Sequence, residues 1–378
     1  MKKTTKVGLL TMHKVINYGS FLQAYATQTI IGSLGYVCEI IDYKYPNQWQ
    51  HDRGSIRRGK LKRLIHQLVK PFGLISEHRK EKKIIDAMNR YYNLSVVAYN
   101  SPEEIKSAPP EYDIYLTGSD QTWNARFTKG DPTFLLGFVS NGGRKVSFSS
   151  SLASNKIEEQ YINLFKELLS EYDAISVREN NGVRLVESLA SRTPPVTLDP
   201  TLVLTKEDWK VLSKSISTRL HRENYILFYM LSYAFEPRPY IYQLLKYWQE
   251  QTGLIVLSFT KIPAEYEIRY IYCGDSGIPE YLHYFEHANY VVTSSFHGTA
   301  FAVNFGIPLL SVVSSANSGD DRQSSFLTKV KLTNCIVPIG SEFDRLNPVY
   351  DEIVAWDQLN FLRKESLNYL KYSLDKTV

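Results

Sequence analysis

The sequence has few cysteines and no long apolar run. Its three cysteines, Cys38, Cys273 and Cys335, are far apart and form no CxxC pair, which excludes a disulfide scaffold and a cysteine-rich zinc site. No stretch approaches the roughly 20 apolar residues that a transmembrane helix needs. The short apolar run at 7–10 is soon interrupted by His13, which favours a first strand over a secretory signal. We therefore expect a protein of the reducing cytoplasm.

Sequence motifs of several enzyme classes are also missing. There is no Walker loop, no GxGxxG turn and no GxSxG elbow, which argues against a nucleoside triphosphatase, a nicotinamide enzyme and a serine hydrolase. His, Cys and carboxylate residues do not occur at the spacing of metal ligands. We therefore expect neither a metal site nor a resident organic cofactor.

The chain alternates short apolar runs with longer helical patterns. Its 378 residues favour two domains over one. Strand–helix alternation predicts parallel sheets covered on both faces, so we expect an α/β fold of two doubly wound domains that face a central cleft. Strands are expected at 6–11, 36–42, 114–117, 146–148, 174–177, 225–230, 254–259, 290–293 and 309–313, with helices between them, for example at 20–34, 157–171, 237–252 and 299–305.

A proline-rich break at 192–201 predicts the end of the first domain. The expected N-terminal domain is 1–203, and a second α/β domain follows at 204–354. The remaining segment, 355–378, has a helical pattern, and we expect it to pack back on the first domain.

Positive charge is concentrated in one segment. Residues 53–83 contain eleven Lys and Arg against two Glu, with apolar residues at helical spacing between them. A basic amphipathic helix of this kind can lie on an anionic membrane surface. A solvated helix with one half-buried face is the simpler alternative. No nucleic-acid-binding motif accompanies the charge, so nucleic acid is not an expected partner.

A candidate anion site follows the expected strand at 290–293. The strand ends in hydroxyl groups, a histidine and a glycine, and an apolar helix begins there. Helix N-termini bind phosphate through their free N–H groups. Ser294 and Ser295 can cap the helix, Gly298 allows close approach of a ligand, and His297 adds a side chain that changes charge near neutrality.

Two arginines could complete such a site. Arg178 directly follows the expected strand at 174–177, where a guanidinium group can bind carboxylate or phosphate through two parallel hydrogen bonds. An ion pair with Glu179 or Asp173 is the structural alternative. Arg322 lies in a polar loop after the strand at 309–313 and is a second candidate.

Two polar turns have the composition of a sugar site. The turn after the strand at 114–117 combines a carboxylate, two amides and an indole, and a similar turn follows the first strand. An aromatic face with amides and acids provides the stacking and directional hydrogen bonds that a sugar ring needs. The candidate acceptor-binding residues are Asn17, Tyr18, Gln23, Asp120, Gln121, Trp123 and Asn124.

Five short runs, in this order, resemble the polysaccharide pyruvyl transferase family. They are 17–20 with 22–25, 118–121 with 123–124, 176–179, 198–201 and 293–298. The resemblance implies a GT-B-like pair of Rossmann-type domains. The implied activity transfers the pyruvyl unit of phosphoenolpyruvate to two hydroxyls of a sugar in a cell-surface polysaccharide, such as a capsule or exopolysaccharide, or in its lipid-linked precursor. A cyclic ketal forms and phosphate is released.

The resemblance also implies roles for particular residues. Arg178 and His297 match the residues that engage the carboxylate and phosphate of the donor, and Arg322 is a weaker match. Some members have an arginine two residues from the glycine, before the position next to the histidine, where this chain has Ser295 and Phe296. Protonation of the enol at C3 requires an acid, and we assign it to His297 as a hypothesis, with Asp120 as a candidate base on the acceptor hydroxyl.

The implied partners are phosphoenolpyruvate as co-substrate and a sugar or lipid-linked oligosaccharide as acceptor. Acceptors of this family are often assembled on a lipid carrier at the inner face of a membrane, where the basic segment 53–83 would suit peripheral attachment. Two other functions share these features. One is a GT-B glycosyltransferase that uses a nucleotide-sugar, and the other is a catalytically silent glycan-binding homologue.

Overall fold

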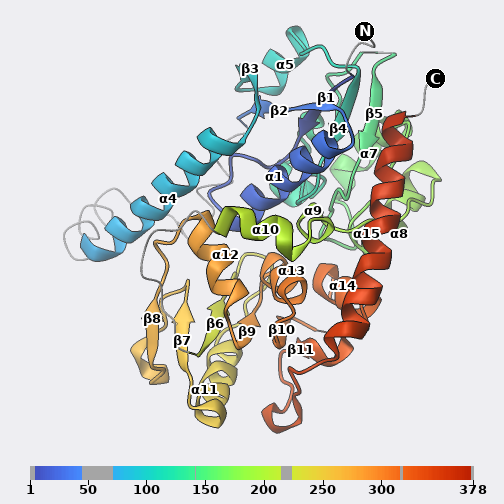
Figure 1. Cartoon of the computed structure of the whole chain (residues 1–378). Helices are drawn as coiled ribbons and strands as arrows, with labels where there is room; N and C mark the ends of the chain where they lie inside the picture. The colour runs from blue at the N-terminus through green and yellow to red at the C-terminus, as the bar shows by residue number, and fades with distance from the viewer. Residues whose placement is uncertain (1–4, 45–70, 141, 214–223, 316–317, 376–378) are drawn as a thin grey trace.

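The protein contains two parallel β-sheets, stacked one above the other in Figure 1. The computed structural model describes residues 5–44, 71–140, 142–213, 224–315 and 318–375. The first sheet has the order β3-β2-β1-β4-β5, and the second has the order β11-β10-β9-β6-β7-β8. The first comprises β1 (Lys6–Leu10), β2 (Val37–Tyr43), β3 (Leu94–Tyr99), β4 (Ile114–Thr117) and β5 (Arg144–Ser147). The second comprises β6 (Tyr225–Tyr229), β7 (Ile255–Ser258), β8 (Tyr270–Tyr272), β9 (Tyr290–Thr293), β10 (Leu309–Val313) and β11 (Ile336–Pro338).

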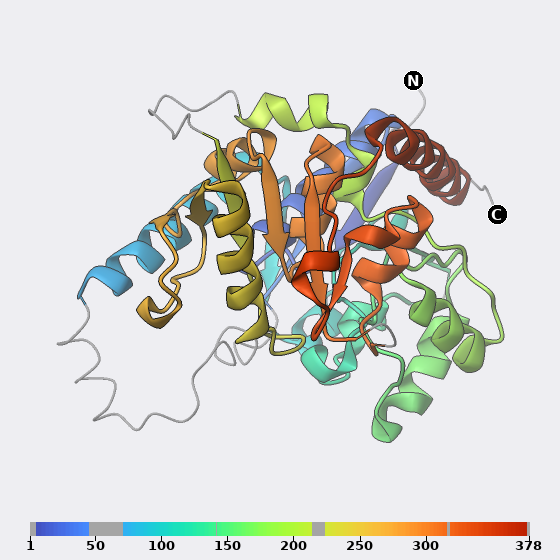
Figure 2. The same cartoon turned by 90° about the horizontal axis from the view of Figure 1, so that it is seen from below.

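Helices connect the strands and cover the sheets, as Figure 2 shows for the second sheet. Both strand orders reverse beside their first strand, as in a doubly wound fold. The predicted α/β fold is therefore confirmed. The helices are α1 (Tyr18–Ser33), α4 (Pro71–Tyr91), α5 (Pro102–Ser107), α6 (Ala125–Thr128), α7 (Ile162–Ser170), α8 (Asn180–Ala190), α9 (Pro200–Val203), α10 (Lys206–Ser213), α11 (Tyr240–Thr252), α12 (Ile278–Glu286), α13 (Phe296–Phe305), α14 (Arg322–Lys329) and α15 (Glu352–Asp375).

The strand expected at 174–177 is replaced by isolated parallel bridges, from Ala174 to Val146 and from Val177 to both Ser150 and Val196. Serine side chains explain the difference. The hydroxyl of Ser147 donates to the carbonyl of Ser176 and accepts from its N–H, so a side chain takes the backbone groups that a ladder would pair. The prediction of a regular strand here was wrong, although the segment runs beside β5.

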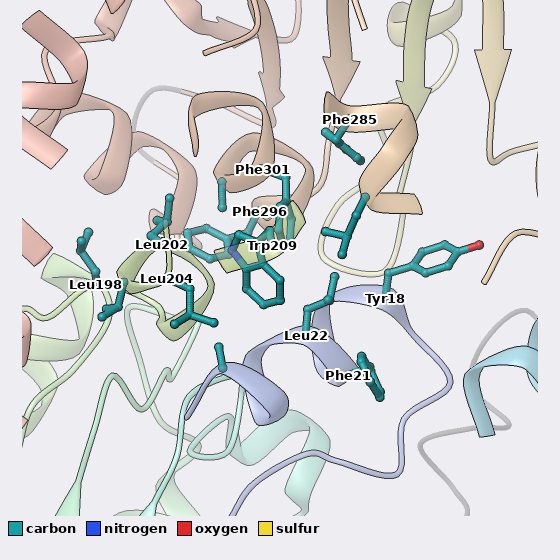
Figure 3. Close-up of a cluster of buried hydrophobic side chains, with 14 of the residues drawn as sticks. Tyr18, Phe21, Leu22, Leu198, Leu202, Leu204, Trp209, Phe285, Phe296 and Phe301 are labelled. Atoms are coloured by element: carbon teal, nitrogen blue, oxygen red, sulfur yellow. The ribbon is translucent and has the colours of Figure 1, made fainter. Parts of the chain in front are cut away.

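One hydrophobic core joins the two sheets (Figure 3). Leu22 on α1, Trp209 on α10 and Phe301 on α13 belong to the same buried cluster. Trp209 is fully buried, its ring centroid lies 5.3 Å from that of Phe301, and its indole N–H donates to the carbonyl of Thr201. The predicted domain boundary at residue 203 stays a prediction, and it falls within this shared core.

Trp209→Ala tests how much the shared core contributes to the free energy of unfolding. We expect the free energy of unfolding to fall by about 3–5 kcal/mol, because the change leaves a cavity between the sheets. Val211→Ala on the same helix is the matched control, since Val211 is 67% exposed, and it should change stability by no more than about 0.5 kcal/mol. Urea unfolding followed by far-UV circular dichroism measures both. Equal stability of the two variants would contradict the prediction.

The C-terminal helix α15 runs alongside both halves of the molecule in Figures 1 and 2. The hydroxyl of Tyr369 donates to the carbonyl of Ser147 at the end of β5, and the hydroxyl of Ser366 accepts from the N–H of Leu198. The guanidinium group of Arg363 donates to the side-chain oxygen of Asn304 in α13. The helix therefore contacts elements of both domains.

Part of the basic segment 53–83 lies outside the described residues, which resume at Pro71. The remainder belongs to α4, which reaches from the first sheet to α12 and β8 (Figure 1). Lys83 is 2.8 Å from Glu280, and Arg79 is 3.9 Å from Asp275. Two of the basic residues thus pair with acids of the second domain. Contact with a membrane stays a prediction. In the part of the chain that the structure describes, no helix is long and apolar enough to cross a bilayer.

Candidate active site

In each sheet the strand order reverses between two neighbouring strands, and the loops that follow these strands lie between the domains. They follow β1 and β4 in the first sheet and β6 and β9 in the second. Ligands of doubly wound folds bind at the carboxyl ends of strands at these reversals. Here the first turn of α1, after β1, contacts the first turn of α13, after β9, because Gly19 packs directly against the His297 ring. The ligand-binding ends of the two sheets therefore meet at this contact.

A buried charged cluster occupies this junction. The Arg178 Nη1 donates to the Asp199 Oδ2 at 2.6 Å, and the Ser119 hydroxyl donates to the same oxygen at 2.8 Å. The His297 Nε2 lies 3.7 Å from that oxygen. The side chains of Arg178 and Asp199 are 1% and 0% exposed. One carboxylate thus joins the two residues that the sequence singled out, Arg178 and His297.

Asp199 belongs to the site but was not among the residues predicted from the sequence. Burial raises its pKa, but His297, Arg178 and Thr201 outweigh that effect and hold the pKa well below the usual range. Its Oδ1 accepts from the N–H and hydroxyl of Thr201, so it also caps α9. The signal was present as the run 198–201. An aspartate before proline reads first as a helix cap, however, and the distant Arg178 and His297 cannot be seen from local sequence.

Several buried polar atoms of the cluster have no hydrogen-bond partner among the described residues. They include Nε and Nη2 of Arg178, Nε2 of His297 and Oε2 of Glu179. Nε and Nη2 form one edge of the guanidinium group, the edge that binds carboxylate or phosphate side-on. Buried polar groups are nearly always satisfied, so the two unpaired nitrogens of Arg178 indicate a place for an anionic group, whereas Glu179 Oε2 requires a donor.

The remaining surroundings of Arg178 hold it in position. Its guanidinium carbon lies 4.5 Å from the centroid of the Phe296 ring, which comes from α13 of the other domain. Its Nε is 3.9 Å from the Glu179 Oε2, and the other oxygen of Glu179 accepts from the backbone N–H groups of Leu152 and Ala153. The structural alternative of a pair with Asp173 is not observed, because the main partner of Arg178 is Asp199.

Asp120 lies beside the first turn of α1. Its Oδ2 accepts from the Ser20 hydroxyl at 2.7 Å, and its Oδ1 accepts from the N–H of Gln121 at 2.9 Å. Its φ of 70° is in the left-handed region, where a residue with a side chain is strained. Asp120 and His297 therefore approach neighbouring residues, Ser20 and Gly19, from opposite domains. A role as base stays a prediction.

Three predicted acceptor residues are fully buried: Tyr18, Gln23 and Trp123. Their polar atoms already bond to protein groups, for example the Trp123 indole N–H to the carbonyl of Phe134. Asn17 caps α1 by accepting from the N–H of Gly19. In this structure these four side chains support the site and offer no surface for a sugar.

Gln121 and Asn124 instead line a hollow between the domains. The Asn124 amide donates to the Gln121 side-chain oxygen at 2.8 Å, and the Gln121 amide donates to the Tyr233 hydroxyl at 3.2 Å. Tyr233 follows β6, so the predicted polar turn after β4 contacts the second domain directly.

The predicted donor-binding residues around α13 shape the helix start. The Ser294 hydroxyl donates to the carbonyl of Leu231 and accepts from its N–H, which ties the ends of β9 and β6 together. The Ser295 hydroxyl caps the helix by accepting from the N–H of Gly298. A side chain at Gly298 would overlap the Thr293 hydroxyl. These groups fix the approach to His297.

Arg322 is buried, but its fork is occupied. Nε and Nη2 donate to the two carboxylate oxygens of Asp320, at 2.7 and 2.5 Å. A role for Arg322 in binding the donor would therefore require this pair to open. Burial raises the pKa of the nearby Glu179 carboxyl, and the positive charges of Arg178 and Arg322 oppose that effect.

The ionised form of the neighbouring Asp321 is disfavoured in the folded protein, because the side chain is partly buried and lies near another carboxylate. Burial, followed by the nearby Glu179 carboxylate, raises its pKa to about 7, and its Oδ1 has no hydrogen-bond partner among the described residues. When the pKa of a carboxyl is higher in the folded than in the unfolded protein, the free energy of unfolding falls as the pH rises from about 4, the unfolded pKa, to about 7, the folded pKa. We therefore expect Asp321→Asn to be more stable than the native protein at pH 8, by on the order of 1–3 kcal/mol, and nearly equal at pH 4.

Asp320→Asn is the matched control, because it removes a carboxylate that is paired with Arg322. It should destabilise the protein at pH 8, the opposite sign. Thermal midpoints at the two pH values measure both variants. A stability difference for Asp321→Asn that does not grow with pH would show that this carboxyl stays ionised at no cost.

Comparisons with known proteins agree with this architecture. A sequence model of the family described as polysaccharide pyruvyl transferase matches residues 17–316. No curated protein matches the chain significantly. Similar solved structures include a putative UDP-N-acetylglucosamine 2-epimerase from Listeria monocytogenes, with 12% identity, a TM-score of 0.52 and coverage of 98% of this chain and 91% of that one. The UDP-N-acetylglucosamine 2-epimerase from Rickettsia bellii is 9% identical, with a TM-score of 0.53 and coverage of 97% and 96%.

A third structure, UDP-GlcNAc 2-epimerase from Methanocaldococcus jannaschii, is 12% identical, with a TM-score of 0.51 and coverage of 95% and 99%. At these identities the likeness shows the fold alone, and it confirms the predicted GT-B-like pair of α/β domains. The family match spans most of the chain and all five runs that suggested the resemblance. This chain belongs to the polysaccharide pyruvyl transferase family.

Proposed function

We propose that the protein transfers the pyruvyl group of phosphoenolpyruvate to two hydroxyls of a sugar, forming a cyclic ketal and releasing phosphate. The observation that carries the proposal is the Nε–Nη2 edge of buried Arg178, which has no hydrogen-bond partner among the described residues and shares the Asp199 carboxylate with His297, within a family of pyruvyl transferases. Phosphoenolpyruvate carries roughly three negative charges near neutral pH and presents a carboxylate and a phosphate, both of which suit a guanidinium fork and a helix N-terminus.

The reaction needs one proton at carbon and one new bond from each hydroxyl. Protonation of C3 makes the methyl group and an oxocarbenium-like C2, which the first sugar hydroxyl attacks as it loses its proton. The C2–O bond to phosphate then breaks, and phosphate leaves with the bonding electron pair. The second hydroxyl attacks C2 and its proton passes to phosphate, so the two hydroxyl protons end on the methyl group and on phosphate.

We assign these steps to the buried cluster. Arg178, whose guanidinium group lies over the face of Phe296, would bind the donor carboxylate, and Asp199 would keep Arg178 oriented through Nη1. His297 would supply the proton to C3 or to the departing phosphate. Asp120, across the first turn of α1, would accept the proton of an attacking hydroxyl.

The test measures the thermal midpoint with phosphoenolpyruvate, inorganic phosphate and a panel of nucleotide-sugars. Stabilisation by phosphoenolpyruvate above that by phosphate supports the proposal, because a ligand that binds the folded state alone raises the midpoint. Stabilisation by a nucleotide-sugar alone would replace it with a glycosyltransferase. Phosphate release that depends on both phosphoenolpyruvate and a glycan acceptor would then establish the transfer.

Gly19→Ala should impair this reaction through His297. A Cβ at position 19 would overlap the His297 ring, so the ring must move away from the Asp199 carboxylate. We expect kcat to fall about 10²-fold, because small misplacements of a reacting group are costly. The measurement is the rate of phosphate release with saturating donor.

Gly32→Ala on the same helix is the matched control. A Cβ there meets no atom within 4 Å, so activity should be unchanged, and stability should rise by up to about 1 kcal/mol. A Gly19→Ala enzyme with native kcat would contradict the idea that the position of His297 limits the rate.

A further inference from the structure

The hollow between the domains has a volume of about 260 Å³ and is not accounted for by the donor site. The first domain contributes Gln121, Asn124 and Phe127, and the second contributes Phe235 and Asp320. Its lining therefore comes from both domains, from segments that follow β4, β5, β6 and β10.

The hollow adjoins the charged cluster through shared residues. Gln121 follows Asp120 directly. Leu152 and Ala153 also line the hollow, and their backbone N–H groups bond to Glu179, the neighbour of Arg178. A molecule in the hollow would thus lie next to a donor bound at Arg178.

Aromatic rings and amides meet in its wall. The centroids of Phe127 and Tyr233 are 6.0 Å apart, and Tyr233 is 39% exposed. The Gln121 amide bonds to the Tyr233 hydroxyl and to Asn124, so two amides lie beside partly exposed rings. This is the combination expected of a sugar site from the sequence. The partly exposed rings in the lining are Phe127 and Phe235, with Tyr233 beside Phe127. Trp123 also lines the hollow, but it is fully buried.

The charges of the hollow are asymmetric. Asp320 is neutralised by Arg322. Arg126 and Lys156 line the hollow with exposed side chains, and neither has an ion-pair partner among the described residues. Glu158 also lines it and is the opposing carboxylate. Two cations against one unpaired carboxylate leave a net positive charge in the lining, which favours an anionic group on the occupant.

We propose that the hollow binds the acceptor as a hexopyranose residue that carries an anionic group. The ring lies against Phe127 and Phe235, its hydroxyls bond to the amides of Gln121 and Asn124, and the anionic group contacts Arg126 and Lys156. That the hollow is the acceptor site rests on the proposed function, whereas binding of an anionic hexopyranose in the hollow does not. The anion is a phosphate or a carboxylate.

The experiment uses saturation-transfer NMR on the full chain with four classes of probe. They are methyl hexopyranosides, methyl hexopyranosiduronates, hexose 1-phosphates and UDP, each with and without phosphoenolpyruvate. We expect one anionic hexose class to bind about 10-fold or more tightly than the neutral glycosides, and the better class identifies the anion as phosphate or carboxylate. The double variant Arg126→Ala/Lys156→Ala should abolish this preference, and Phe127→Ala should weaken binding of every hexose.

Lys129→Ala is the matched control, an exposed lysine at the end of the same short helix that does not line the hollow. Equal binding of neutral and anionic hexoses, unaffected by the double variant, would overturn the anionic requirement. Binding of UDP in preference to any hexose, or of no probe, would overturn the sugar site. A thermal shift with phosphoenolpyruvate that persists in every variant would show that donor binding is independent of the hollow. Absence of this shift from the native protein would contradict the proposed function, whatever the hollow binds.

Discussion

Replacing Arg178 with lysine will lower kcat/KM for phosphoenolpyruvate by about 10²–10³-fold while the protein still folds. Lysine retains the positive charge that the buried Asp199 requires. It cannot present two parallel N–H groups, so the open Nε–Nη2 edge is lost together with side-on binding of the donor. The measurement is steady-state phosphate release, with circular dichroism to confirm the fold.

Arg178→Ala is the less informative variant, because it would leave Asp199 and Glu179 buried without their counter-charge and should destabilise the protein by about 3–5 kcal/mol. Arg192→Lys is the matched control. Arg192 donates to backbone carbonyls of Tyr172 and Asp173, away from the cluster, and its replacement should leave kcat/KM unchanged. If Arg178→Lys retained native kcat/KM, the side-on binding of the donor would be wrong.

The fold was predictable because its strands are short apolar runs between helical patterns. Strands β4, β9 and β10 are almost entirely buried and appear where their sequences place them. The segment 174–177 has the same composition, and the difference arises from the hydroxyl of Ser147, a residue 29 positions from Ser176. Pairing of that kind depends on tertiary contacts and cannot be seen in a local pattern.

The site was predictable in part for a related reason. Arg178 and His297 stand out because polar residues at the ends of buried strands need a partner or a ligand. Asp199 was hidden by its local role as a helix cap, and the contact of Gly19 with His297 joins residues far apart in the chain. Trp123 shows the opposite error. Tryptophan is a residue type that stacks on sugar rings, but only the packing shows that the ring of Trp123 is fully buried.

Replacing His297 with glutamine should lower kcat by about 10²–10⁴-fold and leave the affinity for phosphoenolpyruvate within about 3-fold. Glutamine can still form a hydrogen bond toward the Asp199 carboxylate, which lies 3.7 Å from the native ring nitrogen. It cannot deliver a proton, so only the chemical step should fail. Single-turnover phosphate release measures that step, and the thermal midpoint with phosphoenolpyruvate measures binding. His287→Gln, on the exposed end of α12, is the control for loss of a histidine and should be silent.

Hydrogen exchange at C3 of phosphoenolpyruvate distinguishes the two proton transfers open to His297. In D₂O either route gives a ketal methyl group with one deuterium, so the variant carries the test. If the proton of His297 goes to C3, His297→Gln loses C3 exchange and phosphate release together. If its proton goes only to phosphate, the variant should still exchange the C3 hydrogens of phosphoenolpyruvate with solvent while release is slow. Native turnover in His297→Gln would contradict both, and Asp120, which reaches the same turn of α1 through Ser20, would then be the titratable group left beside the donor.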